Sequence, residues 1–174
     1  MKDIRFTRIR DVKSPVRGTA EAAGIDFFVP NYTEQFEADF RVKNPNIVLE
    51  FSENSTKMTI VLKPGERALI PSGVKTWMEA GTALIGANKS GVASKKGLVY
   101  GAHVIDSDYA GELHINVINT GNESVRIETG EKLIQFIHTP ILLSPLTEVD
   151  NTEFERLHSE SVRGTGGFGS TGTK

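Results

Sequence analysis

The run R-G-T-G-G-F-G-S-T-G over residues 163–172 combines one cation and one aromatic ring with five glycines and three hydroxyls. Glycine lets a backbone approach an anion closely, and arginine holds phosphate oxygens through paired hydrogen bonds. This combination indicates a nucleotide-binding segment, although the same composition is also typical of a disordered tail. The G-x-G-x-x-G from Gly164 to Gly169 does not indicate a Rossmann fold, because that motif needs a following helix and only five residues follow Gly169. We therefore expect a flexible arm over residues 162–174 that closes over a site built elsewhere.

A second cluster, N-K-S-G-V-A-S-K-K-G over residues 88–97, concentrates three lysines and two serines where the strand pattern lapses. Gly91 would let the backbone approach an anion, Ser90 offers a hydroxyl, and Lys89 adds charge at the start of a helical turn. The segment is not a Walker A loop, because two residues separate Gly86 from the Lys89-Ser90 pair. A phosphate site and a solvated basic turn both explain these residues.

A third cluster lies in G-A-H-V-I-D-S-D-Y-A-G-E over residues 101–112. Asp106 follows an apolar pair, so we expect its carboxylate at a strand end beside a buried region, where exclusion of water sharpens a base. Tyr109 can pack its ring on a sugar. A β-turn in which Asp106 or Asp108 accepts backbone hydrogen bonds explains the same segment.

Other polar residues carry weaker signals. Asp26 is a lone acid in an apolar segment and requires a partner, either a metal-bound water or a neighbouring strand. The histidines at 103, 114, 138 and 158 have no zinc-like spacing, so each is expected to be structural or at the surface. No G-x-S-x-G supports a serine hydrolase.

The elements that must position these clusters are mainly strands. Short alternating segments, separated by Gly- and Asn-containing turns, lie at 46–51, 57–62, 68–71, 112–118 and 125–127. No 12-residue segment has a convincing helical period, and the best candidate, 87–96, would hold one or two turns. The pattern predicts an all-β fold.

Strand signals on both sides of residues 52–55 predict a hairpin. Residues 32–60, which contain it, are expected to be an excursion from the main sheet rather than a second domain.

The composition fits one domain over residues 1–174 with a sizeable core, since 38% of the residues are hydrophobic. A net charge of -2 gives no general attraction to nucleic acid or membrane, so small-molecule partners are expected. The chain has no cysteine and no apolar stretch approaching 18 residues. We expect a cytoplasmic protein.

The order of five motifs resembles the homotrimeric dUTPase family. They are A-G-x-D, K-S-G-V-A, V-I-D-S-D-Y-x-G-E, G-E-K-L-I-Q and R-G-x-G-G-F-G-S-T-G, spread over residues 23–172. The resemblance implies a jelly-roll-like β fold, a homotrimer with active sites shared between subunits, and hydrolysis of dUTP to dUMP and pyrophosphate with Mg²⁺.

The resemblance also implies the roles of the residues that meet the nucleoside. Asp106 would be the general base that orients water at the α-phosphorus, and Tyr109 would pack under the deoxyribose. Backbone groups of a hairpin would hold uracil, from Tyr100 through His103, Val104 and Ile105.

The phosphate and metal contacts follow in the same way. Phe168 would stack on the base, and Asp26 would act on magnesium-bound waters in the outer sphere. The phosphates would be held by Lys89, Ser90, Gly91, Gln135, Arg163, Gly169 and Ser170. Such contacts suit phosphoryl transfer, which depends on positioning and charge neutralisation.

The chain departs from the family pattern in three places. Lys89 replaces the usual arginine, which loses a paired donor but keeps the charge. His103 replaces a common glycine, and residues 32–60 exceed the usual connection between the first two motifs.

Two alternatives stay open. The chain could be a nucleotide-sensing regulator that binds a protein partner through residues 32–60. It could instead be a relative of the dCTP deaminases, which share an A-H-x-I-D sequence, but these carry a glutamate ten residues after the aspartate where this chain has Asn116.

Overall fold

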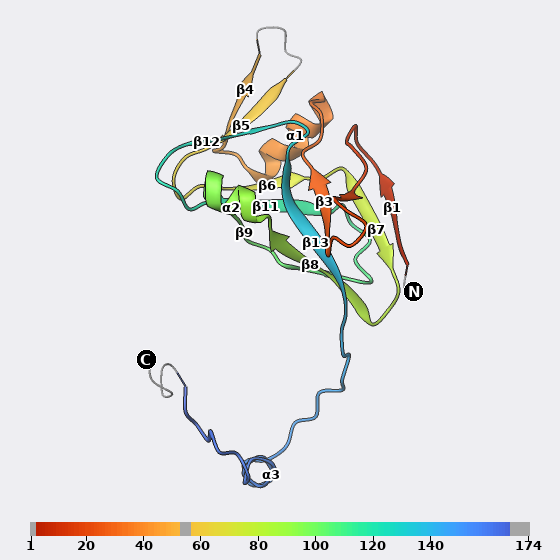
Figure 1. The fold of residues 1–174 in the computed structure, drawn as a ribbon, viewed down its shortest axis with the longest axis vertical. Helices are drawn as coiled ribbons and strands as arrows, with labels where there is room; N and C mark the ends of the chain where they lie inside the picture. The colour runs from red at the N-terminus through yellow and green to blue at the C-terminus, as the bar shows by residue number, and fades with distance from the viewer. Residues whose placement is uncertain (1–2, 53–56, 168–174) are drawn as a thin grey trace. The chain divides into compact units, whose positions relative to one another are not determined.

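Strands dominate the computed structural model, which describes residues 3–52 and 57–167 (Figure 1). The chain divides into two compact units, Met1–Leu142 and Leu143–Lys174. All thirteen strands of the described residues belong to the first unit, which confirms the predicted all-β class.

The first unit contains four groups of paired strands. The largest sheet has the order β10-β8-β13-β3-β2, and a three-stranded sheet has the order β6-β11-β9. A second three-stranded sheet has the order β12-β5-β4, and β1 pairs with β7. The bounds are β1 Ile4–Arg8, β2 Val16–Arg17, β3 Gly24–Phe28, β4 Val48–Phe51, β5 Met58–Leu62, β6 Arg67–Pro71, β7 Val74–Met78, β8 Thr82–Asn88, β9 Leu98–Tyr100, β10 Val104–Asp106, β11 His114–Asn119, β12 Val125–Glu128 and β13 Lys132–Pro140.

Alternating side chains build the core between these sheets. In β5, Met58, Ile60 and Leu62 are fully buried while the residues between them are half-buried. The same alternation in β11 buries Ile115 and Val117. Each such side chain contributes roughly 1.5–3 kcal/mol by leaving water, so period-two segments fix which face of each strand turns inward.

The predicted hairpin forms from β4 and β5, which pair antiparallel with Phe51 opposite Met58. The backbone N–H of Ser52 donates to the carbonyl of Lys57 at 3.0 Å. Because β5 also pairs with β12, the hairpin is joined to the body of the first unit by a shared strand.

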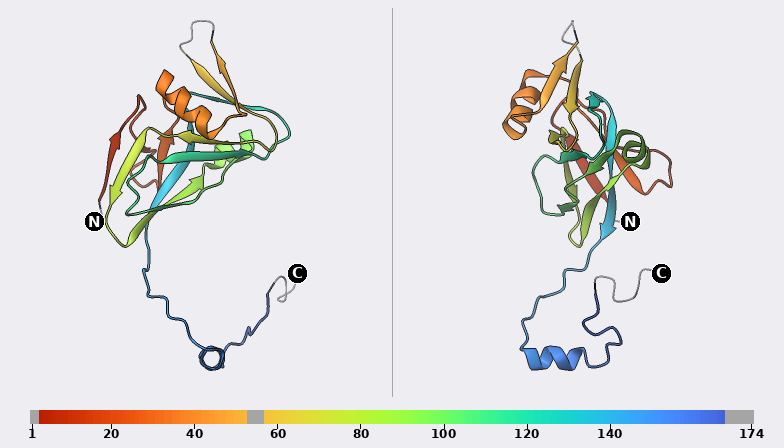
Figure 2. Two further views of the ribbon diagram at one scale, coloured as in Figure 1. Left: turned by 180° about the vertical axis from the view of Figure 1, so that it is seen from behind. Right: turned by 90° about the vertical axis from the view of Figure 1, so that its left-hand side faces the viewer.

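The helix α1, Glu34–Lys43, was not predicted, since the sequence offered only 87–96 as a helical candidate. Thr33 caps it by accepting a hydrogen bond from the Phe36 backbone N–H at 3.0 Å. Only Phe36 and Phe40 of its ten residues are buried, and two buried apolar side chains give a weak helical period. The helix packs against β6 and lies to one side of the strands in the right-hand view of Figure 2.

The described residues contain two further helices, both shorter than α1. The α2 helix, Ser90–Lys96, lies within the predicted 87–96 segment and ends at Gly97, whose φ of 64° is left-handed. The α3 helix, Asn151–Leu157, was not predicted and lies in the second unit, where Asp150 caps it. None of the helices in the described part of the chain has the length and apolar character required to span a membrane.

Candidate active site

A pocket of about 260 Å³ opens beside Asp106. It gathers residues from β6, β9, β10 and β11 and from the turn after β10. Its lining comprises Leu69, Tyr100, Ala102, Val104, Ile105, Asp106, Tyr109, Glu112 and His114. Five residues that the sequence assigned to the nucleoside therefore share one pocket: Tyr100, Val104, Ile105, Asp106 and Tyr109.

Asp106 lies at the end of β10, as predicted, and pairs with Ala83 of β8. Its backbone carbonyl accepts a hydrogen bond from the Tyr109 N–H at 3.2 Å, which closes the turn that follows. The expectation of a shielded carboxylate was wrong for the single chain, since Asp106 is exposed. The reason is topological: β10 is the edge strand of its sheet, so no further strand of the chain pairs with its outer side in the described structure.

Tyr109 is held by the residues that follow it. Its hydroxyl donates to the carbonyl of Glu112 at 3.1 Å. A Cβ at Gly111 would lie 2.4 Å from the Tyr109 hydroxyl oxygen, so only glycine leaves room for the ring in this position. Tyr109 is 43% exposed and lines the pocket.

The segment from Tyr100 to Ile105 is not the hairpin that was expected. Within this fully described segment β9 and β10 do not pair with each other, because β9 pairs with β11 and β10 pairs with β8. The residues between them cross from one sheet to the other. The Gly86 N–H donates to the His103 carbonyl at 2.6 Å, and His103 Nδ1 lies 3.0 Å from the Gly86 carbonyl, where it must act as the donor.

Tyr100 forms the buried end of the pocket. It is 4% exposed, and its ring lies on Gly86, where a Cβ would come within 1.8 Å of ring carbon Cε1. Its hydroxyl is buried without a hydrogen-bond partner among the described residues. Burial raises the pKa of Tyr100 to about 12, so the phenol stays neutral.

The predicted phosphate residues gather around Asp26. Its buried carboxylate pairs with the ammonium group of Lys89 and, at 3.1 Å, with that of Lys132. In the strand register Gln135 of β13 lies opposite Asp26 of β3. Ser90 opens α2 immediately after Lys89. The structure thus brings the first, second and fourth motifs together.

Gly24 explains why the first motif needs a glycine. A Cβ there would lie 1.9 Å from Oε1 of Gln135, so the glutamine side chain lies across this residue. The Gln135 amide then donates to the carbonyl of Asn88 at 3.0 Å. Gly91, by contrast, has no atom within 4 Å of the position a Cβ would take, so space does not require glycine there.

The Asp106 and Asp26 groups do not form one site within a chain. Asp106 lies opposite Ala83 near the start of β8, while Lys89 follows Asn88 at the end of that strand. At about 3.3 Å per residue, the five steps from Ala83 to Asn88 span roughly 16 Å. Asp106 and the cluster around Asp26 are therefore separated along β8.

The C-terminal arm belongs to the second unit. Arg163 is exposed, and its Nε donates to the carbonyl of Gly166 at 2.8 Å. The other arm residues assigned from the sequence, Phe168, Gly169 and Ser170, lie outside the described residues.

Glu112 was missed by the sequence reasoning, although it stands in the third motif. Its carboxylate accepts hydrogen bonds from Arg10 Nε at 2.8 Å, Arg10 Nη2 at 2.9 Å and the Gly73 N–H at 2.7 Å. Burial opposes ionisation, but these hydrogen bonds outweigh it and lower the pKa of Glu112. Arg10 carried no signal in the sequence, because it lies 102 positions before its partner Glu112.

Two further missed residues adjoin these groups. Lys132 is the second cation on Asp26. His114 lines the pocket, its Nδ1 lies 2.8 Å from the Glu112 carbonyl, and burial lowers its pKa. Among the described residues no group of three or more His, Cys, Asp or Glu side chains could hold a metal ion.

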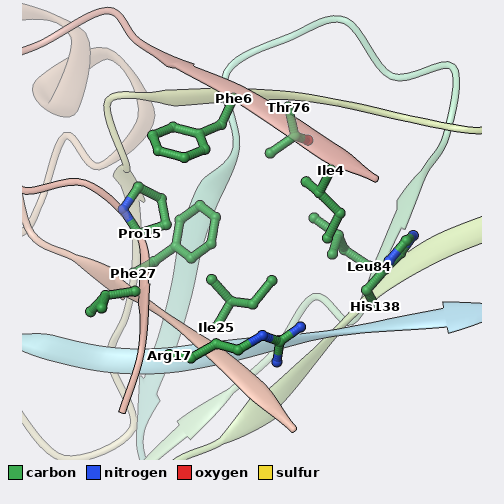
Figure 3. Close-up of a pocket in the computed structure, with 10 residues that line it drawn as sticks. Ile4, Phe6, Pro15, Arg17, Ile25, Phe27, Thr76, Leu84 and His138 are labelled. Atoms are coloured by element: carbon green, nitrogen blue, oxygen red, sulfur yellow. The ribbon is translucent and has the colours of Figure 1, made fainter. Parts of the chain in front are cut away.

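A second pocket, of about 270 Å³, lies between β1, β3 and β8 (Figure 3). Ile4, Ile25 and Leu84 make it largely apolar, and Arg17 and His138 are its ionisable residues. None of the residues predicted for nucleotide binding lines it. Its chemistry does not suit a triphosphate, so the pocket beside Asp106 is the candidate active site.

Comparisons with known proteins agree on one family. Residues 54–172 match the family model described as dUTPase. The deoxyuridine 5'-triphosphate nucleotidohydrolase of Hahella chejuensis is 40% identical over 118 residues, which are 66% of this chain and 74% of that protein. That of Bdellovibrio bacteriovorus is 40% identical over 115 residues, covering 65% and 73%.

Solved structures extend the likeness to nearly the whole chain. The dUTPase of Staphylococcus bacteriophage 80alpha with dUPNHPP has a TM-score of 0.72 and 27% identity, and covers 98% of each chain. The dUTPase of phage phi11 of S. aureus, at 23% identity, shares the fold with a TM-score of 0.66 and covers 86% of this chain and 97% of its own.

Proposed function

Because this chain belongs to the dUTPase family, we propose that it hydrolyses dUTP to dUMP and pyrophosphate, with the nucleoside bound in the pocket beside Asp106. The membership agrees with the resemblance drawn from the five motifs. The observation that carries the proposal is the convergence of Tyr100, Val104, Ile105, Asp106 and Tyr109 on one pocket.

Asp106 acts in this proposal as the general base. Its exposed carboxylate at the end of β10 accepts a hydrogen bond from a water and receives the proton as that water attacks the α-phosphorus. A bond forms from the water oxygen to phosphorus, and the bond to the bridging oxygen of the pyrophosphate breaks. The aspartate contributes position and proton transfer, and pyrophosphate leaves in line with the attack.

In this proposal the nucleoside is recognised by the ring of Tyr109 and by backbone groups of the segment before Asp106. Tyr109, held on Gly111, presents its ring to the deoxyribose, where an added 2′-hydroxyl would crowd it. The Gly101 N–H and the His103 carbonyl are engaged in strand pairing, so we assign uracil to other backbone groups between Ala102 and Ile105. This assignment explains why a side chain at position 103 is compatible with uracil binding, since His103 Nδ1 contacts Gly86.

The phosphates are assigned to the cluster around Asp26. Ser90 and Gly91 are the first residues of α2, and the Gln135 side chain lies across Gly24. Lys89 supplies a positive charge beside Asp26. Arg163, Phe168, Gly169 and Ser170 are assigned to the closing arm on the strength of the fifth motif. Closure would exclude water and strengthen each charged contact.

Mg²⁺ is assigned as the cofactor, and it would neutralise charge on the triphosphate. The described residues offer no cage of carboxylates, but Mg²⁺ commonly takes most of its oxygen ligands from phosphates and water. Asp26 fits an outer-sphere position, because its two oxygens pair with Lys89 and Lys132 and leave it unsuited to direct coordination. No step of the proposed reaction depends on a protein ligand to the metal.

A homotrimer with active sites shared between subunits accounts for the separation of Asp106 from Lys89 along β8. Asp106 and Lys89 lie too far apart to meet one triphosphate within a chain, given the roughly 16 Å span of the intervening strand. A closed ring of identical chains can bring Asp106 of one subunit to the phosphate cluster of the next. Val104, 60% exposed beside Asp106, would be covered by such a neighbour.

Release of pyrophosphate from dUTP, dCTP, dTTP and UTP tests the activity directly. The proposal predicts a far higher kcat/KM for dUTP than for the other three, with dUMP as the product. Equal rates for all four nucleotides would contradict it. Formation of deoxyuridine nucleotides from dCTP would instead support the deaminase alternative, which Asn116 disfavours.

A second function is proposed for residues 32–60, which we infer to bind a protein partner. Val42, Val48 and Phe51 of this segment are exposed apolar side chains. The phage 80alpha dUTPase is described as controlling transfer of virulence genes. Val42→Ser and Val48→Ser change exposed side chains and leave the buried Phe36 and Phe40 in place, so together they should abolish partner binding while dUTP hydrolysis continues. The cytoplasmic location stays a prediction.

A further inference from the structure

Arg10 connects the α1 helix to the pocket beside Asp106. Its guanidinium binds both carboxylate oxygens of Glu112 and also donates to Asp39 Oδ2 at 2.5 Å. The side chains of Arg10 and Glu112 are each 12% exposed, so this contact is shielded from solvent. Asp39 lies on α1, whereas Glu112 lies 73 residues further along the chain and lines the pocket.

Glu112 is also the residue that holds Tyr109. Its carbonyl accepts the Tyr109 hydroxyl at 3.1 Å, and its carboxylate is anchored by Arg10 and by the Gly73 N–H. The acceptor is the Glu112 backbone carbonyl, so the contacts that anchor the Glu112 carboxylate fix the position of the residue that orients the Tyr109 ring. Shielded pairs between planar, charged groups have defined geometry, so Arg10 fixes direction as well as distance.

Asp39 shares one Arg10 nitrogen with Glu112, since Nη2 donates to both carboxylates. Gln35 in turn donates to Asp39 Oδ1 at 2.9 Å. The guanidinium is thus held between the helix and the pocket. Removal of the Asp39 carboxylate would release one side of Arg10 while leaving its paired contact with Glu112.

We propose that Arg10 and Asp39 are positioning residues for the sugar subsite, acting through Glu112 on Tyr109. This inference rests on the proposed function, because it takes Tyr109 as the residue that meets the deoxyribose. It assigns to α1 a second role besides packing: the helix sets the orientation of a pocket side chain that it does not touch.

The variants must separate this role from general stability. Arg10→Ala would leave Glu112 buried without its cation and could prevent folding. Asp39→Ala avoids this, because Asp39 is half-exposed and its loss leaves the Arg10–Glu112 pair. Arg10→Lys keeps the charge but loses the paired donors. Glu37→Gln is the matched control, since Glu37 lies on the same helix and pairs with Arg41 at 2.7 Å.

Fluorine NMR of protein labelled with 3-fluorotyrosine reports the ring environment without substrate. The chain has three tyrosines, so Tyr→Phe variants assign the three signals. Asp39→Ala and Arg10→Lys should shift the Tyr109 signal. Glu37→Gln should shift only the Tyr32 signal, because the Tyr32 hydroxyl donates to Glu37 at 3.1 Å.

The kinetic measurement is the ratio of kcat/KM for dUTP to that for UTP. Coupling between two sites typically changes affinity by about fivefold or more. We expect Asp39→Ala and Arg10→Lys to lower the ratio of kcat/KM values by about that factor. Glu37→Gln should leave it unchanged. An unchanged Tyr109 signal and ratio in Asp39→Ala, or the same changes in Glu37→Gln, would overturn the proposal. If the wild type failed to hydrolyse dUTP, the proposed function would fail, while the Tyr109 signal would still decide whether Arg10 and Asp39 position the ring.

Discussion

Asp106 lies beside the start of strand β8, and Lys89 follows the end of that strand. Asp106 pairs with Ala83 near the start of the strand, and Lys89 follows its last residue, Asn88. Strand β8 thus holds the proposed base and the proposed phosphate-binding cation apart within a chain. This relationship underlies the proposal that neighbouring subunits complete each active site.

Asp106→Asn should lower kcat by roughly a thousandfold, in the range that positioned acid–base groups contribute. Asparagine keeps the size of the side chain but cannot accept the proton from water. Affinity for a nonhydrolysable dUTP analogue, measured by calorimetry, should stay close to that of the wild type. Asp108→Asn is the control, since Asp108 is exposed in the same turn and has no assigned role; near-normal turnover in Asp106→Asn would place the base elsewhere.

Gly86→Ala should destabilise the protein, because its Cβ would lie 1.8 Å from Tyr100 in the core. Overpacking of this kind costs about 1–3 kcal/mol, or more where the ring cannot move. Urea unfolding measures the change. Gly18→Ala is the matched control, since no atom lies within 4 Å of its Cβ position, and equal stability of the two variants would contradict the packing argument.

Stability should fall in acid partly through Glu112. The net effect of its surroundings is a folded-state pKa below the ordinary 4.5, so the unfolded chain binds protons more readily at this group. The stabilisation is complete above that ordinary value and is lost as the pH falls through the folded pKa. Urea unfolding from about pH 6 down to about pH 3.5 should show a shallower decline in Glu112→Gln than in the wild type. Parallel declines in the free energy of unfolding of the two proteins would show that Glu112 does not contribute to the loss of stability in acid.

Truncation after Ser161 should reduce turnover without altering the unfolding of the first unit. The removed residues include Arg163 and the rest of the fifth motif, but none of the strands. Calorimetry checks the unfolding transition and pyrophosphate release checks turnover. Unchanged turnover would exclude the arm from the reaction.

Much of the fold follows from short-range patterns. Alternation in 57–62 and 112–118 identified β5 and β11, because one face of each strand is buried. The α1 helix was missed because Phe36 and Phe40 alone carry its apolar face, although Thr33 followed by acidic residues was a readable start signal. Pairing of β9 with β11 rather than β10 depends on distant strands, which local patterns do not encode.

The site was predictable where chemistry is local in sequence. Asp106 and Tyr109 stand three residues apart and share a pocket. Arg10 could not be found, since its partners Asp39 and Glu112 lie 29 and 102 positions away in the sequence and meet it only in the folded chain. Asp26 was recognised as an acid in need of partners, but Lys132 as its second cation required the register of β3 with β13.

Subunit complementation tests the central claim most directly. Asp106→Asn and Lys89→Ala chains, each expected to be inactive alone, are co-expressed with different tags and purified as mixed oligomers. If Asp106 and Lys89 act from different subunits, each mixed trimer has both residues intact at one of its three sites, and dUTP hydrolysis returns to about a third of the wild-type rate. Mixed oligomers that remain as inactive as either parent would contradict the shared site.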